Sequence, residues 1–309
     1  MALKTWLQRV TLLIPLAMTL AGCGSTQPGP APIPASSSPT PTQDTVPLAN
    51  EDETTPVAGE PGSYERFDIS EDLHVRKVQE GVFVITHAFP WPGNSMIVEV
   101  TPSDLVLVDT PYTPEATRDV LAWVEAQLGE RDITAINTGY HYDNLGGNSY
   151  LIEQGIPVYG SALTAELLEE RGEEIRAMTL EWLQAPQYQR YREAHESLPY
   201  VAPTHLFDLD EGLQLEFGDE TVQVYYPGPS HAVDNVVVYF PDRKLLFGGC
   251  MIIGWDSVGN TSDADLDAWP DSVRNLAQFD FDLLVPGHGD RLDPGLIEHT
   301  IDLLTEFRE

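Results

Sequence analysis

One segment, residues 137–148, combines residue types and spacing that suit metal binding. His141 and Asp143 stand two positions apart in it, after an apolar, β-branched run and before the glycine pair 146–147. Three further candidate ligands stand farther along the chain, each after an apolar, β-branched or aromatic run: His231, Cys250 and His288. Imidazole, thiolate and carboxylate groups together are the ligands that zinc prefers. We therefore predict that these five side chains meet at one zinc centre, positioned by the ends of strands.

The order and spacing of these residues resemble those of the metallo-β-lactamases, and among them the subclass called B1. That family carries His-x-His-x-Asp-x-x-Gly-Gly, then a His, then a Cys after two glycines, then a His in a Pro-Gly-His-Gly turn. The match runs from about Leu73 to the C-terminus, and Gly139 stands where the first His belongs. The resemblance implies an α+β fold, the four-layer αβ/βα sandwich, and hydrolysis of the β-lactam amide bond of antibiotics.

The resemblance also implies two zinc sites of unequal completeness. Asp143, Cys250 and His288 would hold one ion, with a water molecule as the fourth ligand. His141 and His231 would hold the other, but Gly139 offers no side chain, so we expect water to replace the missing imidazole and the affinity to be weaker. His87 and His195 are less favoured substitutes. A mono-zinc carbapenemase stays open as an alternative.

Zinc lowers the pKa of bound water toward neutrality, so the expected nucleophile is a hydroxide that attacks the strained amide carbonyl. Asp143 would orient this nucleophile, and Asn260 would help to polarise the carbonyl oxygen. Trp91, in an apolar hairpin, either covers the substrate ring or packs on the sheet. Ile253 stands where B1 enzymes commonly carry a substrate-binding Lys, so we expect a restricted range that favours carbapenems and some cephalosporins.

The sequence also bears on three other functions. Related thioesterases and RNA-processing nucleases place a His directly after the motif Asp, where this chain has Asn144. That difference and the candidate thiolate ligand Cys250 favour a lactamase. A degenerate, lipid-tethered protein that binds a metal or ligand without turnover stays open, because one ligand and the Lys are missing.

The composition limits the possible partners. The chain of 309 residues carries 49 acidic and 16 basic residues, a formal net charge of −33. Such a field repels phosphate backbones, which argues against a nucleic-acid partner. We expect a monomer whose partners are β-lactam small molecules and a membrane.

The membrane expectation comes from the first residues of the chain. Lys4 and Arg9 flank a short apolar run that ends at Leu20-Ala21-Gly22-Cys23, which resembles a bacterial lipobox. We expect residues 1–22 to be a lipoprotein signal peptide and Cys23 to carry the lipid that anchors the protein to the periplasmic face of a membrane. Residues 23–62 are rich in Pro, Ser and Thr and are predicted to be a disordered tether.

Hydrophobic patterning places the elements of the folded domain, residues 63–309. Apolar runs predict strands at 73–78, 82–86, 96–100, 105–108 and 133–138, and later at 158–159, 213–217, 222–226, 236–240, 245–247 and 283–285. Thr113 as N-cap, Pro114 and the stop signal Gly129 predict a helix between them. Residues 148–154, a stretch around 271–277 and the C-terminus are predicted helical. A helical insert is expected at about 161–199, with a break at Gly172.

Overall fold

The computed structural model describes residues 64–308. The predicted signal peptide, Cys23 and the predicted tether lie outside the described residues. No helix among the described residues is long and apolar enough to cross a membrane.

The first sheet has eight strands in the order of the sequence. They are β1 (Glu65–Asp68), β2 (Leu73–Gln79), β3 (Val82–Ala88), β4 (Pro92–Glu99), β5 (Asp104–Val108), β6 (Asp132–Ile136), β7 (Val158–Ser161) and β8 (His205–Phe207). Strands β1 to β5 form an antiparallel meander, and β5 to β8 pair in parallel. The sequence predicted six of these strands but not β1 and β8.

The second sheet has five strands in the order β13-β12-β11-β10-β9. They are β9 (Leu213–Phe217), β10 (Glu220–Tyr225), β11 (Val237–Phe240), β12 (Leu245–Ile253) and β13 (Leu283–His288). All pairs are antiparallel except β12 with β13, which run in parallel. Cys250 and His288 therefore lie on neighbouring parallel strands.

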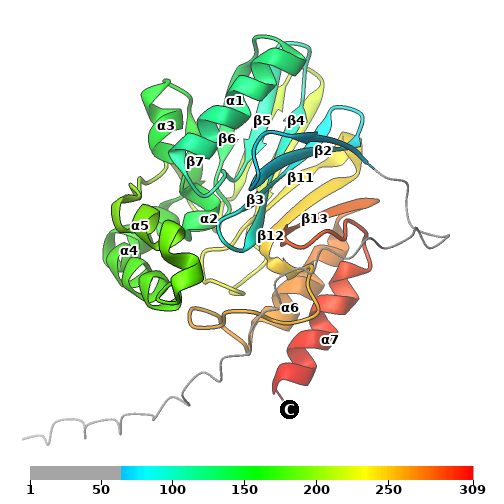
Figure 1. The fold of residues 1–309 in the computed structure, drawn as a ribbon. Helices are drawn as coiled ribbons and strands as arrows, with labels where there is room; N and C mark the ends of the chain where they lie inside the picture. Colours follow the sequence, from blue (N-terminus) through cyan, green and yellow to red (C-terminus); the bar gives the residue numbers. More distant parts are fainter. Residues whose placement is uncertain (1–63, 309) are drawn as a thin grey trace, which may run out of the picture. The chain divides into compact units, whose positions relative to one another are not determined.

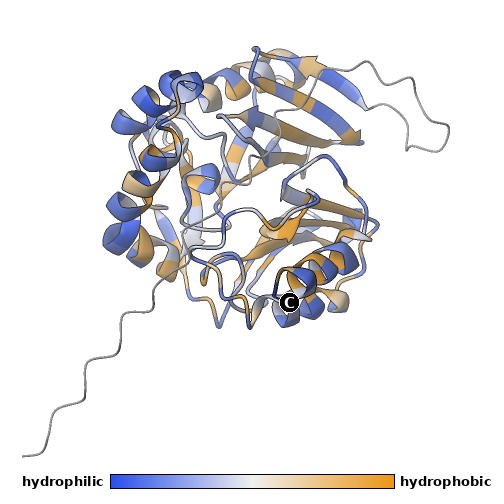
Figure 2. Cartoon of the chain, turned by 60° about the horizontal axis from the view of Figure 1, so that its bottom comes forward, coloured by the Kyte–Doolittle hydropathy of each residue, from blue (hydrophilic) through white to orange (hydrophobic). Residues whose placement is uncertain are grey.

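Alternating side chains divide the core into layers. Val82 and Val84 of β3 point between the two sheets, where Val238 of β11 also packs. Phe83 and Ile85 point the other way, toward helix α1 (Pro114–Leu128). The second sheet is covered on its outer face by α6 (Trp269–Arg274) and α7 (Leu296–Arg308). This arrangement of helix, sheet, sheet and helix is the predicted αβ/βα sandwich, seen as ribbons in Figure 1 and with its largely apolar strands in Figure 2.

Helix α1 has the ends that the sequence predicted. Thr113 is the N-cap and accepts a hydrogen bond from the Ala116 N–H, while Gly129 is the C-cap with a φ of 80°. Such a left-handed φ suits glycine, which has no Cβ to clash. Two short helices, α2 (Tyr142–Leu145) and α3 (Asn148–Glu153), lie at the predicted metal motif, and α2 contains Asp143.

The predicted insert is helical and consists of α4 (Ala162–Trp182), a 3₁₀ turn (Pro186–Tyr188) and α5 (Gln189–Ser197). The predicted break at Gly172 is wrong, because α4 continues through it. Gly172 is buried, and a Cβ there would already be 3.4 Å from Leu168 Cδ1 and 3.8 Å from Tyr200 Cδ2. These are ordinary van der Waals distances, so packing does not require a glycine here. A single glycine costs a helix interior only about 1 kcal/mol, and α4 ends only after Trp182.

Candidate metal centre

The candidate ligands His141 and Asp143 follow β6 at the start of α2. His141 is the N-cap residue and Asp143 lies in the first turn. The glycine pair that follows is required by packing: a Cβ at Gly146 would stand 2.1 Å from Tyr112 O, and one at Gly147 would stand 2.0 Å from Thr117 Oγ1. The glycines thus allow the motif to lie tightly against the start of α1.

Cys250 lies inside β12, a strand longer than the predicted 245–247. The pairing of β12 with β13 shifts register around Gly249, whose φ is 54°. Such a bulge turns the next side chain to a new direction. A Cβ at Gly287 would lie 2.7 Å from Gly249 C, so the two backbones approach closely at this point. The bulge and this approach bring Cys250 and His288 to the same spot.

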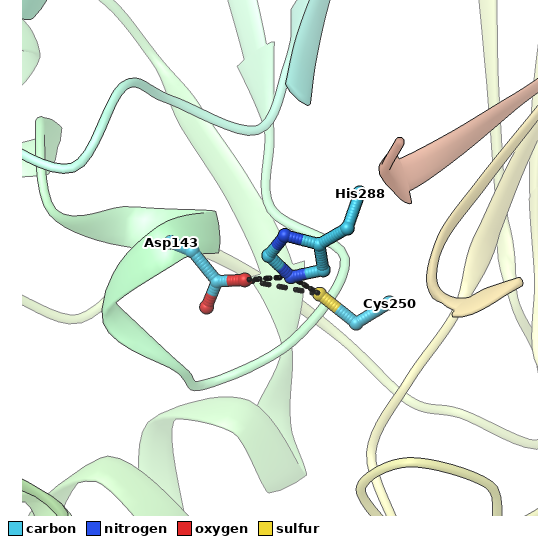
Figure 3. A group of neighbouring side chains, drawn as sticks. All are labelled: Asp143, Cys250 and His288. Carbon is cyan, nitrogen blue, oxygen red and sulfur yellow. Dashed lines mark hydrogen bonds and ion pairs between the residues drawn. The ribbon is translucent and has the colours of Figure 1, made fainter. Parts of the chain in front are cut away.

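Asp143, Cys250 and His288 form a group in which one ligand atom of each lies within 4.8 Å of the others (Figure 3). The Cys250 thiol lies 3.2 Å from Asp143 Oδ2, and His288 Nε2 lies 3.0 Å from the same oxygen. Within residues 64–308 no other group of three such ligands is found. The prediction that these three side chains converge agrees with the geometry.

Burial and neighbouring charges shift the pKa values of the candidate ligands in this group. Burial and then the charge of Asp143 raise the pKa of the Cys250 thiol well above its usual value. Burial is the largest single influence on Asp143 and opposes its charge, but the hydrogen bond and charge of His288, together with His141 and Cys250, outweigh burial and lower the Asp143 pKa. A divalent cation would displace the thiol and imidazolium protons, because thiolate and neutral imidazole are the forms that bind metal.

His141 and His231 lie beside each other, with ring centroids 5.2 Å apart and planes at 84°. His231 comes from the loop between β10 and β11. Burial and the neighbouring charge of His141 lower the pKa of His231 to about 3, so it is neutral near pH 7. A neutral imidazole is ready to bind a cation. The two predicted histidine ligands are therefore also adjacent.

The position of the missing histidine is occupied by amide side chains. A Cβ at Gly139 would stand 2.5 Å from Asn235 Nδ2 and 3.1 Å from Asn144 Oδ1. Both asparagines are buried. Asn144 Oδ1 has no hydrogen-bond partner among the described residues, so a buried acceptor faces this position. The less favoured substitutes, His87 and His195, make other contacts. The Tyr112 N–H donates to His87 Nδ1 at 3.1 Å, and His195 packs on Phe89 and Tyr142.

Groups behind the ligands fix their orientation. His288 Nδ1 lies 2.8 Å from Pro92 O, which leaves Nε2 for a metal. His141 Nε2 lies 3.0 Å from Asp263 Oδ2. The buried Asp109 accepts hydrogen bonds from the Thr138 backbone and hydroxyl and from the Asn144 amide. Burial raises the Asp109 pKa to about 8 despite these bonds. Pro92 O and Asp263 are thus outer partners of the kind that set the tautomer and angle of metal ligands, whereas Asp109 holds Thr138 and Asn144 beside them.

The remaining predicted site residues are Asn260, Ile253 and Trp91. The Asn260 amide oxygen accepts hydrogen bonds from the backbone and hydroxyl of Ser262, so Asn260 is part of a local turn. Ile253 is buried and pairs with His288 in the sheet. Trp91 contacts Trp182 and Tyr188 of the insert, with ring centroids 6.4 and 5.9 Å away. Its role in substrate binding stays a prediction.

Sequence reasoning missed Asp109, Asp263 and the carbonyl of Pro92. Asp109 carried a usable signal, because it follows the apolar run of β5 directly, as the candidate ligands follow theirs. Asp263 stands in a loop rich in acidic residues, and nothing in its neighbours distinguishes it. The buried Asn148 amide donates to Asn137 Oδ1 and Val201 O, which ties the start of α3 to the end of β6.

The donor set fits zinc. Asp143, Cys250 and His288 offer an oxygen, a sulfur and a nitrogen at one point, and the neighbouring imidazoles add nitrogen donors. Sulfur together with imidazole selects zinc over magnesium or calcium. The partly exposed side chains of His288 and Asp143 also leave the group open to a small molecule.

Residues 88–288 match the family model described as the metallo-beta-lactamase superfamily, and the chain belongs to that superfamily. Within it the chain is similar to metallo-beta-lactamase type 2 of Bacillus cereus, at 34% identity over 217 residues, 69% of this chain and 73% of the relative. It is 32% identical over 251 residues to the type 2 enzyme of Bacteroides fragilis, covering 78% and 89%. The solved structure of a metallo-beta-lactamase from Pontibacter korlensis has a TM-score of 0.63 at 31% identity, covering 75% of this chain and 99% of that one. The predicted B1-like family and fold are confirmed.

Proposed function

We propose that this protein hydrolyses the amide bond of β-lactam antibiotics with zinc as its cofactor. The convergence of Asp143, Cys250 and His288 carries the proposal. When bound there, zinc would acidify a water molecule and polarise the substrate carbonyl. The names of the relatives in Bacillus cereus and Bacteroides fragilis support the same activity.

The chain's own residues have separable roles in this reaction. His288 is held by Pro92 O so that Nε2 faces the site. Asp143 is the carboxylate that would orient the attacking water. Asn260 would donate its amide N–H to the carbonyl oxygen of the substrate. Its amide oxygen can keep the hydrogen bond from Ser262 while the N–H donates. The buried, apolar Ile253 cannot pair with the substrate carboxylate, so that group must be met elsewhere.

We propose two zinc ions, with the one at His141 and His231 bound more weakly. Two imidazoles alone supply half of a tetrahedral set. The crowding at Gly139 by Asn235 supports a second candidate, an enzyme that works with the ion at Cys250 alone. Activity measured against zinc equivalents separates the two: a maximum at one equivalent favours the mono-zinc form.

We propose that carbapenems and some cephalosporins are preferred substrates. The insert supports this preference, because its aromatic residues Trp182, Tyr188 and Tyr191 contact Trp91 and Phe89 of the loop before β4. A loop fixed by these contacts leaves less room for substrates with large substituents. Comparing kcat/KM for a carbapenem and for a bulky penicillin tests this, and equal values would contradict it.

Zinc-loaded and chelated protein, extracted as the full mature chain, should be assayed with a carbapenem and nitrocefin. Zinc-dependent hydrolysis is expected, together with its loss in Asp143→Ala. The matched control is Asp290→Ala, an exposed carboxylate near His288 that pairs with Arg76. No hydrolysis by protein that contains zinc would favour the binding protein without turnover.

We further propose that Cys23 carries a lipid and that the enzyme is held on the periplasmic face of a bacterial membrane. The lipobox-like residues 20–23 support this location. Cys23→Ser should move the protein from the detergent phase to the aqueous phase. Unchanged partitioning would refute the lipid anchor but would not bear on the proposed hydrolytic activity.

A further inference from the structure

Arg171, on helix α4 of the insert, reaches from the insert to the metal-binding loops. Its Nη2 lies 2.6 Å from Asp263 Oδ1, and its Nη1 donates to the Tyr140 hydroxyl at 3.0 Å. The Arg171 side chain is about one third exposed, at 33%, whereas that of Asp263 is 2% exposed. The guanidinium group therefore meets a carboxylate that is removed from water.

The same carboxylate holds a candidate metal ligand. Asp263 Oδ2 lies 3.0 Å from His141 Nε2 and accepts a hydrogen bond from the Tyr140 hydroxyl at 2.9 Å. An ionised carboxylate only accepts, so Nε2 of His141 carries the proton and Nδ1 is left for a metal. Asp263 therefore determines which nitrogen of His141 is available and how its ring is turned.

A buried carboxylate needs a cation or several donors to remain charged. Arg171 is the cationic side chain that the structure places on Asp263 from outside the metal loops. We propose that Arg171 is a positioning residue, which holds Asp263 and through it His141, so that zinc affinity at the His141 and His231 site depends on the helical insert. This inference rests on the proposed function, since it assumes zinc at that site.

Positioning explains the geometry better than direct ligation by Asp263. Among the described residues, the group of three converging ligands contains Asp143, Cys250 and His288 but not Asp263. The His288 ring, in contrast, is oriented by Pro92 O, a backbone atom of the sheet. In the part of the chain that the structure describes, Asp263 is thus an outer partner tied to the insert by an ion pair, through Arg171.

The test is a zinc titration of the full mature protein, with Arg171→Met, Arg171→Lys and wild type compared by calorimetry and metal analysis. Arg171→Met is expected to weaken the second zinc by about 10–100-fold, the usual effect of losing an outer partner, and to leave the first unchanged. Cobalt spectra of the second equivalent should change in parallel. Arg171→Lys should restore part of the affinity, because an ammonium group keeps the ion pair.

Two controls separate positioning from general docking of the insert. Arg190→Met removes another ion pair between insert and body, Arg190 with Asp72 at 2.9 Å, which touches no metal loop. It should leave both zinc affinities unchanged. In the double variant, Arg171→Met should add no further loss to Asp263→Asn, because both act on one path.

The inference is overturned if Arg171→Met keeps its second zinc affinity, if Arg190→Met weakens it equally, or if the losses in the double variant add. Wild-type protein that hydrolyses β-lactams yet binds only one zinc also overturns it, while the proposed function stands. Protein that binds two zinc ions with the expected Arg171 dependence but hydrolyses nothing refutes the function alone.

Discussion

The two parts of the metal centre are built differently, although His141 of one part and Asp143 of the other stand only two positions apart. Asp143, Cys250 and His288 meet directly, and each contacts another of the three. His141 and His231 touch only at ring distance, and amides from Asn144 and Asn235 occupy the place of a third ligand. The first part has its full set of three protein ligands. The second part lacks a ligand and depends on the residues that orient its histidines.

The difference follows from where the ligands are attached. Cys250 and His288 lie on adjacent strands whose backbones are locked by sheet pairing, so their separation is fixed by the fold. His231 lies on a loop, and His141 caps a helix of four residues. Loops and short helices need side-chain contacts to hold them, which here come from Asp263 and Arg171.

The largest effect is expected from Cys250→Ser, which removes the soft ligand of the complete part. We expect kcat/KM for a carbapenem to fall by more than about 100-fold, beyond the usual cost of losing a mere outer partner. Metal analysis should show loss of the tighter zinc. Cys23→Ala, assayed in detergent, is the matched control and should keep full activity. A Cys250→Ser enzyme with near-normal kcat/KM would contradict the assignment of the complete part.

A smaller effect is expected from His231→Gln in the incomplete part. This change should remove the weaker zinc and leave the tighter one, because no ligand of the latter is touched. Zinc content after dialysis should fall toward about one equivalent, as a single catalytic site of three protein ligands retains. Loss of both ions together would show that the two parts are one cooperative unit, contrary to the comparison.

Much of this contrast could be predicted from the sequence. The order of His141, Asp143, His231, Cys250 and His288 indicated the complete triad and the incomplete pair, and the alternation of apolar residues indicated most strands. The support of the pair could not be predicted, because Asp263 and Arg171 are 122 and 30 positions from His141 and have ordinary neighbours. The 3.0 Å contact with Asp263 exists only in the folded chain. The predicted break at Gly172 was wrong for another reason, because one glycine costs a helix interior only about 1 kcal/mol and its neighbours are strong helix formers.

Restoring the missing ligand with Gly139→His tests whether the incomplete part is merely lacking a side chain. The Cβ would meet Asn235 Nδ2 at 2.5 Å, so we expect a loss of about 1–3 kcal/mol in unfolding free energy, typical of overpacking, and no gain in zinc affinity. Denaturant unfolding measures the loss. Adding Asn235→Ala should recover part of the stability. A single Gly139→His variant of normal stability with tighter second zinc would show that the position is open.

The smallest effect concerns how the packing of the insert beside the His141 and His231 pair contributes to the free energy of unfolding. His195 of α5 is buried against Tyr142 and Phe89, and burial lowers its pKa to about 4, an effect that the Phe89 backbone opposes and the charge of Arg176 reinforces. A depressed histidine pKa gives stability that is complete above the unfolded value of about 6.5 and is lost as pH falls toward 4.

Between pH 7 and 5 the contribution of His195 to the free energy of unfolding should fall by about 2 kcal/mol. His74 and His87 also have pKa values lowered by burial to about 4 and act in the same direction, so the informative quantity is the difference between His195→Phe and wild type. His195→Phe should lose less unfolding free energy over this range, and His74→Phe provides a control in β2, outside the insert. Acid could weaken the affinity for the second zinc equally in wild type and His195→Phe. In that case the link between the insert and the histidine pair does not depend on His195, and Arg171 alone would connect them.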